Sequence, residues 1–482
     1  MEQTQKSPSL SKQIGLFLGP AAAVLMLLLG APDGLTHEGW ATATLLIWMA
    51  VWWATEAIPI PVTSLLPLVV IPLIGAGSPI EAASGYSSPI VMLLLGGFVI
   101  ATGIERWNLH KRIALNIVSR VGSSPTMLVL GFMVATSLIS MWISNTATTL
   151  MMAPIAISAA AVLKQKREGF VVALLLGVCY SASIGGIATP IGTPTNLIAI
   201  KWLEDHTDTN IGYARWMSFG VPALVLLIPV AWWVVTRRMP KAENSGKVVE
   251  EIHDQKAALG SISAPEKRTA IVFGIVATLW VLRVPIQKSL ANMELSWLAP
   301  ISDMGIAMAG AIAMFLVPSG SGERRALLTW PEAVKLPWGV LILFGGGISL
   351  GKAVTRTGLS EWLGTLLQVL DALHPIFFVA AVVAMVVFLT ELTSNVATMT
   401  TLAPVLGALA AAIGAAPQSL LAPAAVAASC AFMLPVATAP NAIIYATDKV
   451  PIQKMIARGL RLNLLAIIAI TAIGYWLAPL VL

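Results

Sequence analysis

Long apolar runs separated by short polar connections dominate the sequence. The runs cover residues 14–30, 41–58, 61–77, 89–104, 170–200, 218–236, 269–287, 300–318, 337–353, 421–446 and 460–480. Because a helix needs roughly 20 apolar residues to span a bilayer, they predict about 11 transmembrane helices. Two further stretches, 127–162 and 375–413, each consist of two shorter apolar pieces with a polar joint. We therefore expect an all-α, polytopic membrane protein in which these two stretches are re-entrant hairpins.

The two polar joints are nearly identical. Ser144-Asn145-Thr146 corresponds to Ser394-Asn395-Val396, within "SNTATTLMMAPIAISAA" and "SNVATMTTLAPVLGALA". Upstream, "LLLGGFVIATGIER" matches "LILFGGGISLGKAVTR", and downstream "CYSASIGGIATPIGTPTN" matches "CAFMLPVATAPN". Three matching blocks in one order at one spacing indicate an internal duplication. Paired hydrophobic segments interrupted by glycine and proline are typical of a transporter binding site.

The number of crossings between the hairpins and the distribution of Lys and Arg predict the membrane topology. An odd number of full crossings separates the hairpins, so they enter from opposite faces and the repeat is inverted. With a cytoplasmic N-terminus, most Lys and Arg residues fall in cytoplasmic connections, as the positive-inside rule requires. The exceptions, on or near the outer side, are Lys201, Arg215, Arg283, Lys288, Lys352 and Arg356. We expect a multi-pass protein of a bacterial inner (plasma) membrane.

Composition agrees with a membrane location. The chain is 57% hydrophobic and 11% charged, whereas soluble domains carry about 25% charge. The pI near 9.3 could suggest a nucleic-acid partner, but the basic residues are scattered in short connections, so we expect membrane lipid and no nucleic acid. Cys179 and Cys430 are predicted to be small packing residues without a disulfide. The long polar segment 237–268 is predicted to be a cytoplasmic linker with a short surface helix.

The hairpin tips carry the candidate chemistry. Where one short helix ends and another begins, free carbonyls and free amides face each other. Carbonyls and hydroxyls suit a sodium ion, and a helix N-terminus with an Asn amide suits a carboxylate. The partner segments "GGIATPIGTPTN" and, more mildly, "LPVATAPN" are too rich in Gly and Pro to remain helical. Each repeat is therefore predicted to form one cation site, with an anion bound between the two.

Four charged residues lie within or beside the apolar runs. Acids inside a membrane are functional candidates by default. Glu391 is predicted to orient the second hairpin, with direct cation ligation as the alternative, and Glu56 to cap a helix or pair at an interface. Arg106 and Arg356, at matching repeat positions, are interpreted as span-end anchors, with substrate attraction as the alternative.

The motifs resemble one known family. The twin tips together with "WWATEAIPIPVTSLLP", "TELTSNVATMT", "GTPTN" and "MLPVATAPN" are similar to the divalent anion/sodium symporters, which carry dicarboxylates, citrate and sulfate. The resemblance, from about Trp40 to the C-terminus, implies a homodimer of elevator type. Residues 1–126 and 269–374 would be scaffold, residues 127–236 and 375–482 would form the transport domain, and 237–268 would link the halves.

The same resemblance implies a set of site residues. The first sodium site would use Ser140, Ser144, Asn145 and Gly192. The second would use Thr390, Thr393, Asn395 and Ala437, largely through backbone carbonyls. The substrate would meet Ser144, Asn145, Thr146, Thr193, Ser394, Asn395 and Thr438. Val396 replaces a threonine, and Ala439 a proline, of many dicarboxylate-carrying members, which leaves the size and charge of the substrate open.

The expected function is sodium-coupled symport of C4-dicarboxylates such as succinate, malate and fumarate by an elevator mechanism. Sodium ions are expected as coupling ions, with no other cofactor and a small anionic metabolite as substrate. A citrate or sulfate symporter and a sodium-independent exchanger stay open as alternatives, and a channel is a further rival because broken helices also line pores. An enzyme is not expected, because the sequence offers no Ser/His/Asp set, histidine cluster or paired acids at one depth.

Overall fold

The computed structural model describes residues 10–121, 124–161, 168–207, 209–237, 239, 246–292, 301–322, 324–367 and 374–482. Apart from an isolated β-bridge between Pro318 and Ala326, the regular structure of these residues is helical. The first half comprises α1 (Leu10–Leu29), α2 (His37–Thr55), α3 (Ile60–Thr63), α4 (Leu66–Leu73), α5 (Pro79–Ser84), α6 (Pro89–Arg106), α7 (Leu109–Val118), α8 (Pro125–Ser140), α9 (Asn145–Ala161), α10 (Glu168–Gly186), α11 (Pro194–His206) and α12 (Tyr213–Thr236). The second half comprises α13 (Gly246–Ala258), α14 (Ala264–Asn292), α15 (Asp303–Leu316), α16 (Trp330–Ala333), α17 (Trp338–Arg356), α18 (Leu359–Leu367), α19 (Pro375–Leu389), α20 (Asn395–Ala412), α21 (Gln418–Ala428), α22 (Ala439–Tyr445), α23 (Ile452–Trp476) and α24 (Ala478–Val481).

The predicted all-α membrane class is confirmed. Within the described residues, eight helices are long and apolar enough to cross a membrane, and shorter apolar helices accompany them. The predicted span 61–77 was wrong as one helix, because it forms the short helices α3 and α4. Pro67, in the first turn of α4, has no amide with which to continue α3. The predicted total of about 11 crossings stays a prediction.

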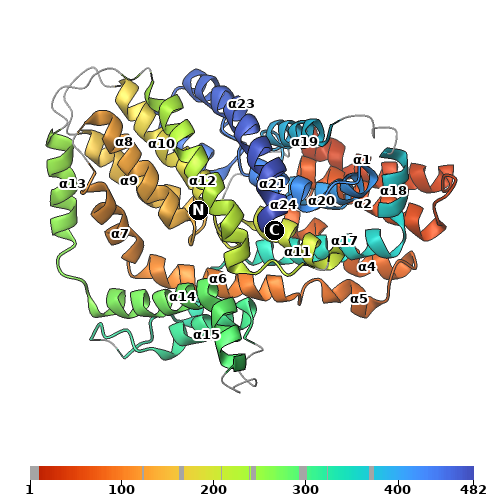
Figure 1. The fold of residues 1–482 in the computed structure, drawn as a ribbon, viewed down its shortest axis with the longest axis horizontal. Helices are drawn as coiled ribbons and strands as arrows, with labels where there is room; N and C mark the ends of the chain where they lie inside the picture. The colour runs from red at the N-terminus through yellow and green to blue at the C-terminus, as the bar shows by residue number, and fades with distance from the viewer. Residues whose placement is uncertain are drawn as a thin grey trace.

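The two predicted hairpins are present. The pair α8 and α9 is joined by residues 141–144, and the pair α19 and α20 by residues 390–394. Each hairpin packs on the interrupted helix of its own repeat, the first on α10 and the second on α21. Figure 1 shows the first hairpin on the left of the molecule and the second to the right of α21.

Two reciprocal ion pairs, each joining one repeat to the other, show how the repeats are arranged. Arg106, at the C-terminus of α6, places Nε 2.6 Å from Oε1 of Glu332, which precedes α17. Arg356, at the C-terminus of α17, places Nη2 3.0 Å from Oε1 of Glu81, which precedes α6. The C-terminus of each helix therefore lies beside the N-terminal side of the other, so α6 and α17 run in opposite directions. This supports an inverted repeat and gives the two arginines the predicted anchoring role.

The Glu332 pair allows a test by pH. Burial alone would raise the pKa of the Glu332 carboxyl, but hydrogen bonds from Arg325, Thr329 and Arg106 outweigh it and lower that pKa from 4.5 to about 2. A depressed pKa stabilises the fold above pH 4.5, and this contribution is lost as the pH falls toward 2. We expect Glu332→Gln to cost about 1 kcal/mol of stability at neutral pH, since the pair is partly exposed.

The measurement is the thermal unfolding midpoint in detergent between pH 7 and pH 3. The difference between wild type and Glu332→Gln should shrink toward pH 3. Glu250→Gln, at an exposed position on α13, is the matched control and should track the wild type throughout. A difference that stays constant with pH would show that the Glu332 charge does not stabilise the fold.

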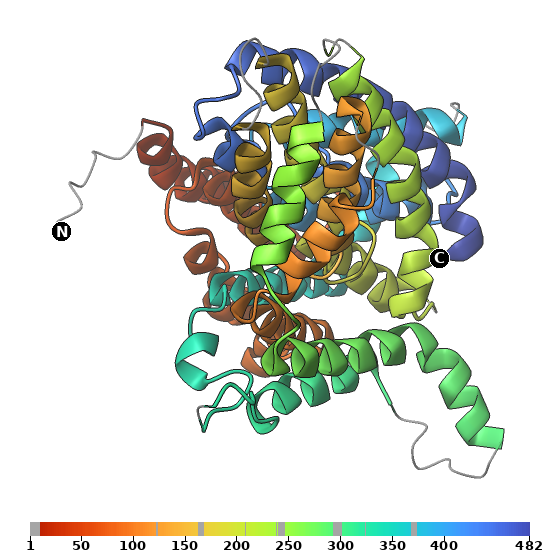
Figure 2. The same cartoon turned by 90° about the vertical axis from the view of Figure 1, so that its left-hand side faces the viewer.

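The polar segment between the halves contains the predicted surface helix. This helix, α13, packs on α7 and α9, and Figure 2 shows it in green on the surface between them. Arg112 of α7 holds the end of the segment, because its guanidinium donates to the carbonyls of Leu259 and Gly260 and pairs with Glu266 at 2.9 Å. Residues 240–245 of the predicted linker lie outside the described residues.

Candidate functional site

The tips of both hairpins line one cavity of about 820 Å³. Its polar wall comes from the two tips and the two helix breaks, through Ser144, Asn145, Thr146, Gly192, Thr193, Thr393, Ser394, Asn395, Ala437 and Thr438. Segments about 250 residues apart in the sequence thus meet, as the duplication predicts. A volume of this size is within the range that holds a small metabolite.

Each tip is built around an asparagine with the same environment. In the first, Ser140 Oγ lies 2.7 Å from both Asn145 Oδ1 and the carbonyl oxygen of Ala182. In the second, Thr390 Oγ1 lies 2.7 Å from Asn395 Oδ1 and 2.9 Å from the carbonyl oxygen of Ala428. The hydroxyl residue therefore fixes the asparagine side chain against the broken helix of its own repeat. Ser140 and Thr390, both buried, stand behind the asparagines and do not line the cavity.

The two breaks are residues 187–193 and 429–438. Asn196 Nδ2 donates to the carbonyls of Gly186, Ile187 and Thr189, at 3.0, 3.2 and 2.8 Å. Asn441 Nδ2 donates in the same way to Ala431 and Leu434, at 3.0 and 2.9 Å. Each side-chain amide satisfies carbonyls that the lost helical turn leaves free, which a membrane interior otherwise penalises. The turns are therefore held open as fixed structures.

The first break also depends on a close approach at Gly186. A Cβ atom there would lie 2.5 Å from Asn145 Oδ1 and 3.0 Å from the carbonyl oxygen of Gly192. Only glycine lets the end of α10 approach the hairpin tip this closely. The Asn145 side chain and the backbone of residues 186–192 thereby form one oxygen-rich cluster, whose ligand types suit a hard cation.

The second break was predicted to be the milder one, and this was wrong, since it is the longer of the two. Its extra length follows from Glu391, whose side chain is buried at 3% exposure. Glu391 Oε1 accepts from the amides of Phe432 and Met433 at 2.8 and 2.9 Å, and from Asn463 Nδ2 at 2.7 Å. Its Oε2 accepts from the Leu434 amide at 2.9 Å. Because the carboxylate binds these amides, they are withdrawn from helical hydrogen bonding.

These bonds tie the second hairpin tip, which carries Glu391, to the second break, and this supports the predicted orienting role. The carboxylate is occupied by four donors and does not line the cavity, which does not favour direct cation ligation. Met141 occupies the corresponding position of the first repeat, so the two tips differ in charge. The second tip has a buried negative group beneath it, and the first does not.

Side chains also connect the two breaks. The hydroxyls of Thr195 and Ser429 lie 3.0 Å apart. Cys179 Sγ donates to Asn441 Oδ1 at 2.8 Å, so this cysteine does more than fill space. Both cysteines are free and buried. These contacts join the two halves of the molecule at the helix breaks.

Several hydroxyls near the tips already have partners. Ser144 Oγ accepts from the amide of Ala147 at 3.3 Å, and Thr438 Oγ1 accepts from the amide of Asn441 at 3.2 Å. Thr393 Oγ1 donates to the carbonyl of Leu389 at 2.9 Å. The hydroxyls of Ser144 and Thr438 can still donate a second bond toward the cavity. Thr393 Oγ1 already has a second partner, the hydroxyl of Thr398 at 2.6 Å.

The remaining wall of the cavity includes Trp53, which belongs to the motif "WWATEAIPIPVTSLLP". Phe98 and Val340, which sequence analysis did not identify, line it as well. They are ordinary apolar residues within apolar helices, so no local signal distinguishes them. Lys12 and Glu56 also line the cavity and form an ion pair at 3.2 Å. Glu56 is the C-cap residue of α2 in the left-handed conformation, at φ 47°, with its backbone amide bonded to the carbonyl of Trp52, as one of the two predicted roles requires.

The chain is similar to known proteins over nearly its whole length. The model of the sodium:sulfate symporter transmembrane region matches residues 10–482. The sodium-dependent dicarboxylate transporter SdcS of Staphylococcus saprophyticus is 38% identical, over 99% of this chain and 93% of the relative. The protein of the same name from Staphylococcus aureus is 39% identical, over 99% and 94%.

Two solved structures share the fold. MtrF of Neisseria gonorrhoeae, described as one of a class of antimetabolite efflux pumps, matches with a TM-score of 0.56 at 14% identity, over 95% of this chain and 97% of its own. The YdaH transporter of Alcanivorax borkumensis matches with a TM-score of 0.56 at 14% identity, over 92% and 98%. At such identity the likeness supports the fold alone. The family match across residues 10–482 and the relatives at 38–39% identity establish that the chain belongs to the sodium:sulfate symporter family, the divalent anion/sodium symporters that its hairpin motifs resemble.

Proposed function

We propose that the protein is a secondary active transporter that couples the movement of a C4-dicarboxylate, such as succinate, malate or fumarate, to sodium ions. The observation that carries this proposal is the pair of hairpin tips, with matched Asn145 and Asn395, facing one cavity. Relatives named as sodium-dependent dicarboxylate transporters, at 38–39% identity over nearly the whole chain, support the choice of substrate and coupling ion.

Two sodium sites would lie at the tips. The first would use Ser144, Asn145 and Gly192, with Ser140 holding Asn145 in place. The second would use Thr393, Asn395 and Ala437, with Thr390 behind Asn395. Unwound carbonyls and asparagine oxygens are the ligands that such carriers offer to sodium.

The anion would bind between the tips, where the sequence-predicted substrate residues line the cavity. These are Ser144, Asn145, Thr146, Thr193, Ser394, Asn395 and Thr438. The amides at the start of α9 and α20 would face its carboxylates. Neither tip carries a Lys or Arg, and Lys12 on the far wall is paired with Glu56. Because the charge of a dianion needs a counter-charge, bound sodium would be a precondition for anion binding.

We further propose an elevator movement. Two sets of helices pack closely, α6 with α15 and α17 with α4 and α5 in one, and the hairpins with α10, α21 and α23 in the other. Contacts of α7 with α8 and of α17 and α18 with α20 join the two sets. In this proposal the first set would be the scaffold and the second the transport domain. A homodimer formed through the scaffold belongs to the same proposal. Lys12 and Glu56, on the predicted cytoplasmic side, line the cavity, which supports an inward-facing state.

Citrate and sulfate are the alternative substrates, and one observation keeps citrate open. Val396 lines the cavity where many dicarboxylate carriers have a threonine, so the second tip lacks one hydroxyl donor toward a carboxylate. The cavity volume does not exclude a tricarboxylate.

The test is uptake of labelled succinate into proteoliposomes containing purified protein. We expect accumulation when an inward sodium gradient is imposed and essentially none when choline replaces sodium. Unlabelled malate, fumarate, citrate and sulfate, added in turn, would rank the substrates by competition. Equal uptake with choline, or counterflow without sodium, would identify an exchanger and contradict the coupling. A single-channel current would contradict a carrier.

A further inference from the structure

A second, smaller pocket of about 40 Å³ lies beyond the cavity along the same three helices. Each of these helices lines the cavity with one residue and the small pocket with a later one. The residues of the cavity are Pro194 on α11, Val340 on α17 and Val396 on α20. The corresponding residues of the pocket extend to Trp202, Lys352 and Pro404. All three helices run from the cavity toward this pocket. Each residue adds about 1.5 Å of rise, so the two spaces lie end to end within one or two helical turns.

The predicted scaffold and transport helices touch directly at the small pocket. Phe344 of α17, one turn beyond Val340 of the cavity, lines the near end of the small pocket and is buried at 1% exposure. One turn further along α17, a Cβ atom on Gly347 would lie 2.3 Å from Cγ2 of Thr400 on α20. The predicted scaffold helix α17 thus touches the predicted transport helix α20 without a gap. Because Gly347 and Thr400 both line the small pocket, their contact leaves it only about 40 Å³.

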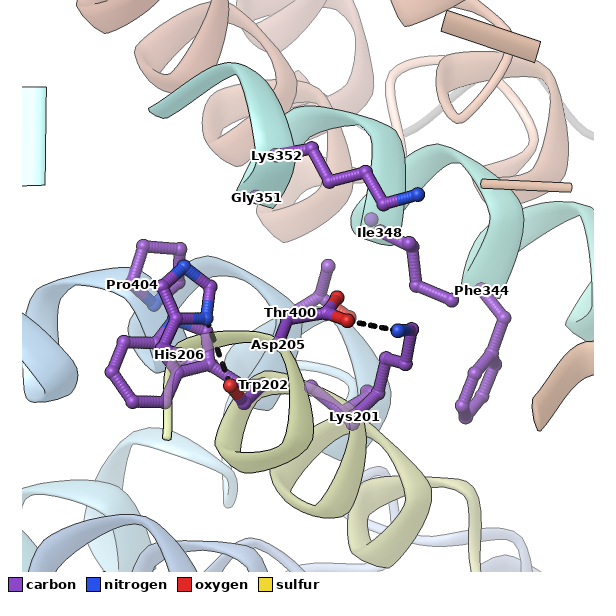
Figure 3. A pocket seen from close by; sticks show the side chains of 13 residues that line it. Lys201, Trp202, Asp205, His206, Phe344, Ile348, Gly351, Lys352, Thr400 and Pro404 are labelled. Carbon is purple, nitrogen blue, oxygen red and sulfur yellow. Dashed lines mark hydrogen bonds and ion pairs between the residues drawn. The ribbon is translucent and has the colours of Figure 1, made fainter. Parts of the chain in front are cut away.

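The pocket carries charges that suit an anion. Figure 3 shows Lys201 of α11 and Lys352 of α17 on opposite sides of it. Lys201 pairs with Asp205 one turn along its helix, and Lys352 Nζ donates to Ser84 Oγ at 3.1 Å. The remaining titratable lining residue is His206, which stacks on Trp202 with ring centroids 4.2 Å apart. Lys201 and Lys352 are two of the few basic residues predicted on the outer side.

We propose that this pocket is the contracted outer vestibule of the transport path, in which Lys201 and Lys352 bind the divalent anion before it reaches the hairpin tips. The proposal rests on the proposed function and adds a recognition site to it. Movement of α11 and α20 past α17 would part the two lysines and admit the anion. One carboxylate would displace Asp205 from Lys201, and the other would bind Lys352. Asp205 acts as an internal competitor that neutralises Lys201 while the vestibule is closed.

The experiment measures sodium-driven succinate uptake into whole bacterial cells that lack their own dicarboxylate carriers, so that only the outer face meets substrate. We expect Lys201→Gln and Lys352→Gln each to raise the half-saturating succinate concentration about fivefold, the size expected for losing one partly exposed charge contact. This effect should weaken at high ionic strength. We expect Asp205→Asn to lower the half-saturating concentration, because it frees Lys201. The sodium dependence should stay unchanged in all three variants.

Opposite shifts for Lys201→Gln and Asp205→Asn separate recognition from a structural role. If the pair only stabilised α11, both substitutions would impair uptake in the same direction, and the proposal would be overturned. An unchanged half-saturating concentration in Lys352→Gln would overturn it as well. Lys201→Arg, which keeps the charge, should restore wild-type uptake even if Lys201→Gln folds poorly. Lys288→Gln, an exposed lysine on the predicted outer side, is the matched control and should have no effect. Absence of sodium-driven uptake in the wild type would instead refute the proposed function.

Discussion

Replacing Glu391 by methionine is expected to lower the stability of the protein by about 3–5 kcal/mol, because four buried or partly buried donors lose their acceptor at once. Three of them are backbone amides of residues 432–434, and the fourth is Asn463 Nδ2. The first repeat carries a methionine, Met141, at the equivalent position, so a side chain of this size is already accommodated in a hairpin tip. The thermal unfolding midpoint in detergent, with and without sodium, measures the loss.

The same substitution should also impair the second cation site. The Glu391 carboxylate holds the break at residues 429–438 in place and adds a negative group beneath the second tip. We therefore expect the sodium concentration for half-maximal uptake to rise at least about tenfold in any protein that folds, which corresponds to about 1.4 kcal/mol.

Two controls make this result interpretable. Glu391→Gln keeps one acceptor oxygen but turns an amide group toward the backbone amides, so it should show an intermediate loss. Met141→Leu, at the matching position of the first repeat, conserves volume and should cost less than about 1.5 kcal/mol. Wild-type stability together with wild-type sodium dependence in Glu391→Met would show that the second break holds its shape without the carboxylate.

The second large effect is expected at Gly186. An alanine there would place Cβ 2.5 Å from Asn145 Oδ1, so the asparagine must move away from Ser140 and from the backbone of the first break. Overpacking of this kind typically costs about 1–3 kcal/mol. Because the displaced group is a proposed sodium ligand, we expect sodium-driven succinate uptake to fall about 30-fold or more at a fixed sodium concentration.

Gly274→Ala is the matched control, because a Cβ atom at Gly274 of α14 would meet nothing within 4 Å. It should leave both uptake and the unfolding midpoint at wild-type values or raise the midpoint slightly. Should Gly186→Ala retain wild-type uptake and wild-type sodium dependence, the first cation site would not be formed by Asn145 and this break.

The features that the sequence predicted well are those encoded locally. Apolar runs must be long enough to cross a bilayer, so their lengths show where helices cross and where hairpins turn back. The joints at Ser144 and Ser394 are polar at membrane depth, which needs a functional reason, and their repetition predicted that both would reach one site.

The features that only the tertiary structure decided depend on partners far away in the sequence. Glu391 reaches the amides of residues 432–434, and Arg106 reaches Glu332, through contacts that no local pattern records. Phe98 and Val340 became the wall of the cavity, although they look like any other apolar residue of a membrane helix. The length and polarity of each segment are properties of the chain itself, whereas the identity of its neighbours follows from how the two antiparallel repeats pack.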